Sequence, residues 1–406
     1  MSNLPLASAL PSDAPSSTGC VHARETRSKP HHALVEPIFQ TSTYTFDNMA
    51  DAVAYQEAHL HGQVSDRFEY GRYGNPTTAA AEARLAALEG AETAVLVASG
   101  MAALTYTFLK LLPSGSHIVM TDDSYRRTRQ FCEEWLKPFN VTCAVVPLGD
   151  FDALEAAIRP ETRLLFSETP SNPFMRVLDV ERFAEVGRRR GVLTAIDATF
   201  STPINLNPLA WGIDLVIHSA TKYLGGHNDL MAGFIAGAAQ VVNPIRDYIG
   251  IAGGIADPHA AFLLLRGMKT LALRMAQHNR NGQAVAEFLS THPKVEQVFY
   301  SGLPAHPGHA IAARQARGFG GVVSILVRGD RAATFRFLDA LRLIYLSPSL
   351  GGVESLALHP AAMAYPDCKP AERLALGMTD NLVRLALGIE DAQDLIADLD
   401  QALRAV

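Results

Sequence analysis

The sequence predicts an α/β fold, with a mostly parallel sheet in a large domain and a smaller C-terminal α+β domain. Between about residues 73 and 268, short apolar or β-branched runs alternate with helical patterns, as in strands joined by crossover helices. Beyond residue 272 the alternation stops and strands and helices follow in a different order. The length of 406 residues agrees with two domains, because a single core rarely exceeds about 250 to 300 residues.

The large domain is predicted at residues 73–271. Its expected strands are residues 94–98, 117–120, 142–147, 163–167, 193–196, 215–218 and 234–238. Its expected crossover helices, where apolar residues recur at three- and four-residue spacing, are residues 78–88, 102–111, 152–158 and 180–190. This alternation is typical of a sheet covered by helices.

The small domain is predicted at residues 272–406. A long helix over residues 258–290 leads into it, followed by strands at 295–300, 322–327 and 343–346. A last helix over residues 390–405 places Leu395, Ile396, Leu399 and Leu403 on one face. Residues 1–33, rich in Ser, Pro and Ala, are predicted to be a disordered tail, and residues 34–72 an N-terminal arm.

Composition excludes several classes of function. A net charge of -6 disfavours nucleic-acid binding, and the longest apolar stretch is too interrupted for a membrane span. The four cysteines form no CxxC pair, which favours a reducing compartment without disulfides or a zinc site. The tail lacks the apolar core of a signal peptide. We therefore expect a cytoplasmic protein; basic residues in the tail leave organelle targeting as an alternative.

One lysine and one carboxylate mark the expected site. Lys222 follows the hydroxyl residues Ser219 and Thr221, just after the strand at 215–218. Asp197 ends the strand before it. Consecutive parallel strands present their carboxyl ends at one sheet edge, where open α/β sheets bind ligands. A carboxylate at the end of a buried strand also calls for a positive partner. We expect Lys222 and Asp197 to face a common ligand.

The third element is the turn Ser99-Gly100-Met101, which links a strand to a helix. The NH groups at such a helix start, with a glycine that permits close approach, can bind a phosphate. A phosphate anchor, a lysine that captures an aldehyde and a carboxylate for a ring nitrogen are together what pyridoxal phosphate requires. The residues themselves thus predict this cofactor.

The sequence also resembles a known family, the Cys/Met-metabolism pyridoxal-phosphate enzymes (trans-sulfuration enzymes). The resemblance covers roughly residues 34 to 405. It is carried by SATKYLGGHND (219–229), FEYGRYGNPTT (68–78), ASGMAA (98–103), ETPSNPF (168–174) and SLGGVESL (349–356). Within that family the chain is similar to the plant-type cystathionine gamma-synthases, through YRRTR (125–129), LGGHND (224–229), GFGG (318–321) and LSPS (346–349).

The resemblance implies an aspartate-aminotransferase-like fold of type I and assigns the cofactor contacts. Lys222 would bind the cofactor covalently, and Tyr125 would stack on its ring and assist proton transfer. The remaining contacts within the chain would be made by Asp197, Thr199, Ser219, Thr221, Gly100 and Met101. Tyr70 and Arg72, on the arm, would reach the phosphate of a neighbouring subunit, where Tyr70 would also take part in catalysis. The resemblance thus implies shared active sites in a homotetramer, a dimer of dimers.

The resemblance also assigns the amino-acid substrate. Arg384 would hold its carboxylate through two parallel hydrogen bonds, completed by Asn172 and the backbone at Ser349.

The chain departs from many relatives around the substrate. Arg126 and Arg127 stand where those relatives have two glycines, and would either bind an acidic leaving group or be solvated. Pro348 replaces a frequent glutamate. Glu69 would either meet an incoming amino group or be solvated. His227 and Asp229 lack a third ligand at workable spacing, so no metal is expected.

The expected reaction is γ-replacement in methionine biosynthesis. An O-acyl- or O-phospho-L-homoserine would lose its γ-substituent, a thiol such as L-cysteine would attack the γ-carbon, and cystathionine would form, with Lys222 as the main acid and base. One alternative is a γ-lyase of the cystathionine or methionine type. Another is a tailoring enzyme that uses a different activated amino acid, such as S-adenosylmethionine, and a non-thiol nucleophile.

Two readings from other classes are weaker. A dinucleotide-dependent dehydrogenase would need GxGxxG after an early strand, and the sequence has none. A non-catalytic scaffold with this fold would have no reason to retain Lys222, Asp197, Tyr70, Arg72 and Arg384 together.

Overall fold

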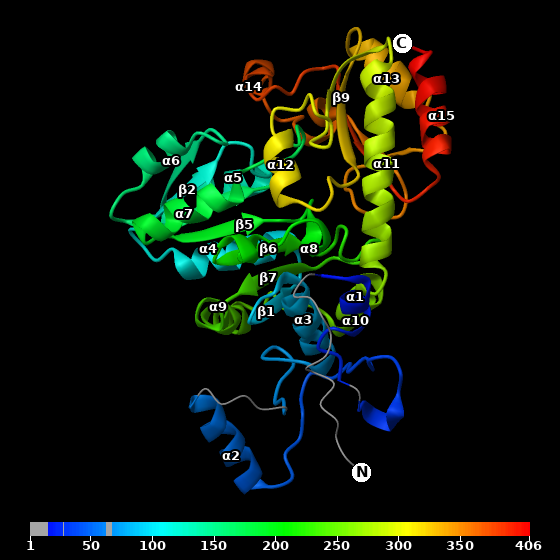
Figure 1. Cartoon of the computed structure of the whole chain (residues 1–406). Helices are drawn as coiled ribbons and strands as arrows, with labels where there is room; N and C mark the ends of the chain where they lie inside the picture. Colours follow the sequence, from blue (N-terminus) through cyan, green and yellow to red (C-terminus); the bar gives the residue numbers. More distant parts are fainter. Residues whose placement is uncertain (1–14, 27, 62–66) are drawn as a thin grey trace.

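A seven-stranded sheet forms the centre of the large domain in the computed structural model, which describes residues 15–26, 28–61 and 67–406 (Figure 1). The strand order is β1-β7-β6-β5-β4-β2-β3. Its strands are β1 Thr93–Val97, β2 His117–Thr121, β3 Thr142–Val146, β4 Thr162–Glu168, β5 Leu193–Asp197, β6 Leu215–Ser219 and β7 Gly233–Gly237. All neighbouring pairs are parallel except those of β7, which runs antiparallel to β1 and β6. The predicted mostly parallel sheet is confirmed.

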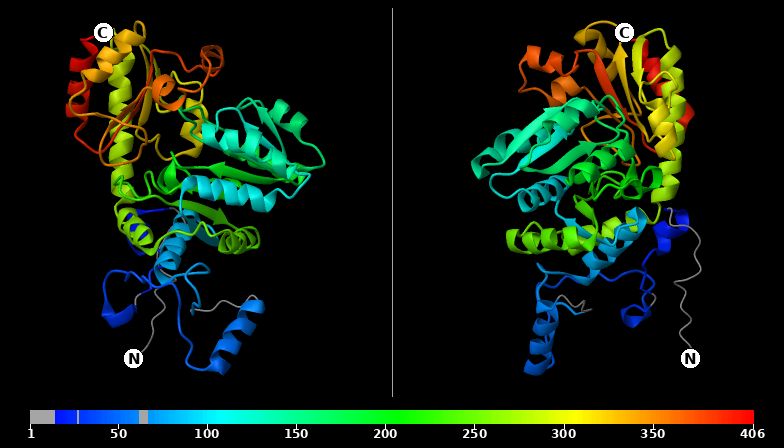
Figure 2. Two further views of the ribbon diagram at one scale, coloured as in Figure 1. Left: turned by 180° about the vertical axis from the view of Figure 1, so that it is seen from behind. Right: turned by 60° about the vertical axis from the view of Figure 1, so that its left-hand side comes forward.

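Helices cover both faces of this sheet (Figures 1 and 2). The four predicted crossover helices are present as α3 Pro76–Glu89, α4 Gly100–Leu111, α6 Phe151–Ala157 and α7 Val180–Arg190. The sequence reading missed α5 Arg126–Gln130, η3 Phe131–Trp135, η4 Lys137–Phe139, α8 Thr202–Asn205, η5 Pro208–Trp211 and α9 Ala239–Ala252. The central strands are buried on both faces, which explains why they read as continuous apolar runs.

A five-stranded sheet forms the small domain, in the order β10-β11-β12-β9-β8. Its strands are β8 Val295–Phe299, β9 Val322–Val327, β10 Tyr345–Leu346, β11 Leu356–Leu358 and β12 Leu382–Ala386. Its helices are α11 Leu271–Thr291, α12 His309–Gln315, α13 Arg331–Asp339, η6 Pro360–Ala364, α14 Pro370–Ala375 and α15 Ala392–Leu403. The sequence reading missed β11 and β12, and β12 carries a residue of the expected site.

The connection between the domains differs from the single helix expected over residues 258–290. Two helices are present, α10 Pro258–Met268 and α11, with Lys269 and Thr270 between them. α11 begins at Leu271, next to the predicted domain boundary at residue 272, which stays a prediction. From there α11 runs along the small domain (Figures 1 and 2).

The predicted disordered tail is wrong for α1, Ser17–His22. Cys20 is fully buried in the core beneath α3, and the buried Arg84 of α3 donates hydrogen bonds to the carbonyl oxygens of Cys20, Val21 and Ala23. These bonds satisfy carbonyl groups that a helix end leaves unpaired. The physical reason for the error is therefore a tertiary contact. Residues 1–14 and 27 lie outside the described residues.

The arm extends away from the body of the molecule (Figures 1 and 2). η2, Pro30–His32, precedes the arm and lies in the predicted tail. The arm contains α2, Met49–Leu60, and no side chain of α2 is buried. Leu34, Met49 and Leu60 are 85%, 78% and 81% exposed. Within the described ranges, no helix of the chain is long and apolar enough to cross a membrane.

Candidate active site

The carboxyl edge of the large sheet brings Asp197, Ser219 and Gly100 together. β5 and β6 are parallel, with Asp197 in register with Ile217, two residues before Ser219. A Cβ atom built on Gly100 would lie 2.7 Å from the Cβ of Ser219, so the start of α4 rests directly against the end of β6. The sheet edge expected from the sequence is therefore present.

The start of α4 presents NH groups beside two hydroxyls. The Ser99 hydroxyl caps the helix by accepting a hydrogen bond from the Ala102 amide at 3.1 Å. Helix geometry leaves the amides of Gly100 and Met101 without intrahelical acceptors. Ser219 lies against this turn, and the Thr221 hydroxyl is held by the backbone of Ala232. This arrangement can bind an anion such as a phosphate.

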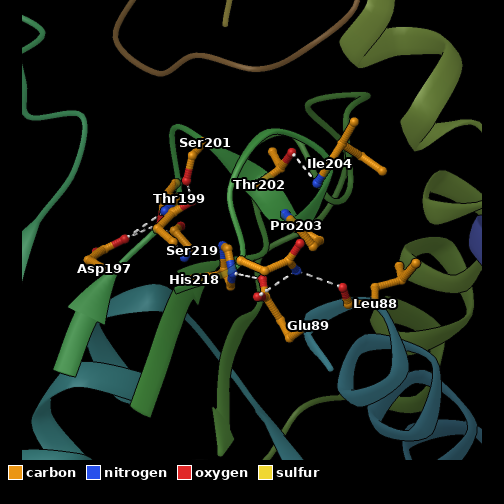
Figure 3. A network of polar contacts seen from close by, with 12 residues as sticks. Leu88, Glu89, Asp197, Thr199, Ser201, Thr202, Pro203, Ile204, His218 and Ser219 are labelled. Atoms are coloured by element: carbon orange, nitrogen blue, oxygen red, sulfur yellow. Dashed lines mark hydrogen bonds and ion pairs between the residues drawn. The ribbon is translucent and has the colours of Figure 1, made fainter. Parts of the chain in front are cut away.

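Asp197 is a buried carboxylate held in a fixed orientation (Figure 3). Its Oδ1 accepts hydrogen bonds from the Thr199 amide at 2.9 Å and the Thr199 hydroxyl at 2.5 Å. The same hydroxyl oxygen accepts a bond from the Ser219 amide at 2.8 Å, which ties the two strand ends together. Burial raises the pKa of Asp197 against the opposing effect of these bonds, so a cationic ligand would stabilise its charged form.

Behind this edge lies a second buried pair, which the sequence reading did not identify (Figure 3). Nε2 of His218 lies 2.5 Å from Oε1 of Glu89, and both side chains are at most 1% exposed. The Asn207 amide donates to the Leu88 carbonyl at 2.9 Å and contacts Glu89. The charge of His218 is also the weakest of the influences that lower the pKa of Asp197.

Lys222 follows β6 and reaches the small domain. Its Nζ donates a hydrogen bond to the Ser349 hydroxyl at 2.8 Å. Burial, assisted by the charge of Arg384, lowers the pKa of the Lys222 amine to about 8. Ser349 has a φ of +98°, a conformation that non-glycine residues adopt only under strain and that recurs at functional sites. Lys222 is thus a partly desolvated amine that can be neutral near physiological pH.

Arg384 lies on β12 and is 5% exposed. Its Nη1 donates to Oδ1 of Asn172 at 3.1 Å and its Nη2 to the carbonyl oxygen of Ser349 at 2.6 Å. Its Nε is buried and has no partner among the described residues. Since an unpaired buried donor of this kind is costly, an incoming carboxylate would satisfy it. The three residues expected to grip a substrate carboxylate therefore lie together.

Tyr125 lies just before α5, with its side chain 43% exposed. Its backbone amide donates to Oε2 of Glu168 at 2.8 Å. Glu168 ends β4, in register with Asp197, and burial together with the charge of Asp197 raises its pKa well above the usual value. The sequence reading missed Glu168 as a site residue. The signal was available, because it is a carboxylate at a strand end, as Asp197 is.

Three expected residues make their contacts with the arm and with α9 rather than with Lys222. Tyr70 pairs with Thr43 in the arm, and Arg72 lies over the ring of Tyr73 and donates to the Gly250 carbonyl on α9. Glu69 accepts a hydrogen bond from Gln56 of α2. Their assignment to a neighbouring subunit stays a prediction.

The remaining expected residues lie at the rim. Arg126 forms an ion pair with Asp367 at 2.6 Å, whereas the exposed Arg127 donates to Gln130. Pro348 is exposed and precedes the strained Ser349. His227 contacts the Gly225 carbonyl and Asp229 is exposed. In the parts of the chain that are described, no three His, Cys, Asp or Glu side chains cluster as metal ligands would.

A sequence model of the Cys/Met metabolism PLP-dependent enzyme family matches residues 17–404. The chain belongs to this family. The match confirms the resemblance, the enzyme class and the cofactor, pyridoxal 5'-phosphate. Enzymes of this family act on small-molecule amino acids.

Individual relatives agree with this assignment. The enzyme is 48% identical over 375 residues to cystathionine gamma-synthase 1, chloroplastic, of Arabidopsis thaliana, covering 92% of this chain and 66% of that one. It is 42% identical to L-methionine gamma-lyase of Pseudomonas putida, covering 92% and 93%. The crystal structure of metB from Corynebacterium glutamicum matches with a TM-score of 0.88 at 36% identity, covering 96% and 97%. The predicted type I fold is confirmed, and the chain spans about two thirds of the Arabidopsis relative.

The residues present fit the cofactor. The close approach of Gly100 to Ser219 leaves no room for a side chain where a phosphate would sit. Asp197 is a buried carboxylate suited to a protonated ring nitrogen, and the lowered pKa of Lys222 suits an amine that must attack an aldehyde. We propose that these residues hold the cofactor.

The lowered pKa of Lys222 gives a pH prediction. Only the neutral amine attacks an aldehyde, so the rate of cofactor uptake by the apoenzyme should rise with pH through about 8 and level off above it. Stopped-flow absorbance after mixing apoenzyme with pyridoxal phosphate measures this rate. Arg384→Gln should move the inflection to higher pH, because the charge of Arg384 contributes to the shift. If the rate kept rising until the pH approached 10.5, the ordinary pKa of a lysine amine, the assignment would be contradicted.

Gly100→Ala should weaken cofactor binding by about tenfold or more, because the new methyl group would force α4 away from Ser219. Titration of the apoenzyme with pyridoxal phosphate measures the dissociation constant. Gly19→Ala is a matched control, since a Cβ there meets its nearest atom at an ordinary 3.5 Å, far from the site. Equal affinities for the two variants would argue against a phosphate at the start of α4.

Proposed function

We propose that the enzyme catalyses γ-replacement on an O-acyl- or O-phospho-L-homoserine, with a thiol such as that of L-cysteine as nucleophile and cystathionine as product. The observation that carries this proposal is that Ser349 contacts both Lys222 and Arg384. Its hydroxyl accepts from Lys222 Nζ, and its carbonyl accepts from the buried Arg384. An amino acid held by its carboxylate at Arg384 therefore has its α-carbon beside the lysine amine. The 48% identity to a cystathionine gamma-synthase supports the choice of reaction.

The chain's own residues would bind, orient and move protons. Bound pyridoxal phosphate supplies an electron sink that acidifies the carbon-bound protons of the substrate. Lys222, as a neutral amine, would accept the α-proton and return a proton at the end of the reaction. Arg384, Asn172 and Ser349 would fix the carboxylate and hence the orientation of the γ-carbon. Tyr125, held by Glu168, would pack against the reacting atoms.

Arg127 is the better of the two rim arginines for an acidic leaving group. It is exposed and its guanidinium has a neutral partner, Gln130, which an anion can displace at little cost. Arg126 already has an anionic partner. We therefore propose that Arg127 contacts the phosphate or carboxylate of the departing group.

We propose a dimer of dimers in which the arm completes a neighbouring site. The exposed apolar side chains of the arm, Leu34, Met49 and Leu60, support it. Exposed apolar side chains do not stabilise a single chain in water, whereas a neighbouring subunit would bury them. Tyr70, Arg72 and Glu69 would then reach the neighbour's cofactor and substrate. The cytoplasmic location expected from the sequence stays a prediction.

A second candidate is γ-elimination, as in a methionine or cystathionine γ-lyase. It is favoured by the 42% identity to the L-methionine gamma-lyase of Pseudomonas putida. The same binding of the α-amino acid serves both reactions, which differ in whether a thiol or water reacts after the leaving group departs. A tailoring enzyme for S-adenosylmethionine is a more distant alternative.

Product analysis distinguishes these reactions. The purified enzyme should be incubated with O-phospho-, O-acetyl- and O-succinyl-L-homoserine, L-methionine and S-adenosylmethionine, each with and without L-cysteine, and the products identified by mass spectrometry. The proposal predicts cystathionine from at least one activated homoserine only when cysteine is present. An oxo acid and ammonia formed at the same rate with and without cysteine would favour the lyase and overturn the proposal.

A further inference from the structure

Arg126 links the large domain to the small domain immediately beside Tyr125. Its Nη2 lies 2.6 Å from Oδ1 of Asp367, and its Nη1 donates to the Ala364 carbonyl at 2.6 Å. Its Cζ lies 5.0 Å from the centre of the Tyr365 ring, within the range of a cation-π contact. The arginine side chain is 21% exposed. One guanidinium thus makes three different contacts with a single segment of the small domain.

The other arginines after Tyr125 behave differently. Arg127 donates to Gln130, and Arg129 forms an ion pair with Glu133 at 2.9 Å. Both partners belong to the same helical stretch, α5 and η3. Of these three arginines, Arg126 is the one that contacts the small domain, so its contacts do not follow from helix spacing.

The segment that Arg126 contacts connects the two strands around the carboxylate site. It leaves β11 through η6 and returns through α14 to β12, which carries Arg384. Leu358 of β11 is in register with Arg384. A shift of this connection would therefore be transmitted to the strands that place the arginine.

The same segment borders a cavity of about 820 Å³ between the domains. Tyr365 and residues 375–378 line it from the small domain, and Ser124 and Asn172 line it from the large domain. Asn172 is also a partner of Arg384. The segment that Arg126 contacts thus lines the same cavity as Asn172 of the amino-acid site.

We propose that Arg126 is a positioning residue that clamps residues 364–377 of the small domain to the start of α5, and so holds the domains closed around the amino-acid site. Tyr125 is then fixed on two sides, by its own amide to Glu168 and through the next residue to the small domain. This inference rests on the proposed function only in that the bound molecule is an amino acid. It also separates the two rim arginines, because a leaving-group anion at Arg126 would have to displace Asp367.

Hydrogen exchange tests the clamp without any substrate. In the holoenzyme, Arg126→Ala should accelerate amide exchange in residues 364–377 by about tenfold. Arg129→Ala, which removes a paired arginine from the same helical stretch, should leave that segment unchanged. Asp367→Asn alters only an exposed side chain and should act in the same direction as Arg126→Ala, but less, since the carbonyl and ring contacts remain. Unchanged exchange in both Arg126→Ala and Asp367→Asn would overturn the proposal.

Kinetics with the substrate found by product analysis give the second readout. Arg126→Ala should raise KM for the activated amino acid about fivefold to tenfold, with cofactor content unchanged and a smaller effect on kcat. Arg126→Lys should recover part of this loss. A higher KM without faster exchange, and without any effect of Asp367→Asn, would mean that Arg126 binds the substrate directly. Faster exchange in an enzyme that turns over none of these amino acids would refute the proposed function and leave the clamp standing.

Discussion

Lys222→Ala should abolish the visible absorbance of the bound cofactor and lower the turnover number by roughly 1,000-fold or more. The reason is that one amine has two tasks, covalent attachment of the cofactor and transfer of the substrate protons. Its contact with the Ser349 hydroxyl places it at the amino-acid site, and its lowered pKa makes it a competent base. Spectra of the purified variant and steady-state kinetics measure the two effects separately.

Two further variants control for folding and for charge. Lys222→Arg keeps a cation but cannot attack an aldehyde, so it should lose activity as Lys222→Ala does. Lys269→Ala removes the lysine between α10 and α11 and should leave both absorbance and activity unchanged. A Lys222→Ala protein with the same absorbance band as the native enzyme would exclude Lys222 as the attachment site.

Arg384→Ala should raise KM for the amino-acid substrate by roughly 100-fold, a loss of about 3 kcal/mol of binding free energy. The guanidinium is buried, holds Asn172 and Ser349 on one edge and keeps an unpaired Nε for a ligand. Its removal takes away the charge that pairs with the substrate carboxylate. Initial rates over a range of substrate concentrations give KM, and absorbance gives the cofactor content, which should stay near that of the native enzyme.

Arg384→Lys separates geometry from charge. A lysine keeps the positive charge but lacks the planar fork that matches a carboxylate, so it should recover only part of the lost affinity. Asn172→Ala should give a smaller increase in KM, because Arg384 would keep its bond to Ser349. If Arg384→Ala left KM unchanged, the substrate carboxylate would have to bind elsewhere.

The large domain could be predicted well because its signals are local. Each strand is a short apolar run between helical patterns, and Lys222 and Asp197 follow two consecutive strands, so their common edge follows from parallel pairing. The anion site at Gly100 follows from a helix start. These features can be predicted from short stretches of sequence and from one topological rule, that neighbouring parallel strands end at the same sheet edge.

The small domain was less predictable for the same reason. β12 is a five-residue strand whose short apolar run is interrupted by an arginine at its centre, and the sequence pattern was not recognised as a strand. Arg384 was found only through the family resemblance. Its partner Asn172 is 212 residues away, so only the tertiary fold brings the two together.

Long-range contacts also explain the errors. Arg126 and Ala364 are 238 residues apart. The spacing of residues along the sequence therefore could not show that this arginine bonds to the small domain. The tail was predicted to be disordered from its composition, yet α1 is held by Arg84 of α3. In both cases an arginine donates hydrogen bonds to backbone carbonyls of a distant segment. Such contacts cannot be predicted from the local sequence.

The most direct test of the site is to fix the cofactor in place chemically. The holoenzyme would be reduced with borohydride, digested with a protease and analysed by mass spectrometry, with the Lys222→Ala protein treated in parallel. We predict the reduced cofactor on the peptide that contains Lys222, and no modified peptide in the variant. Cofactor found on any other lysine of the native enzyme would contradict the account.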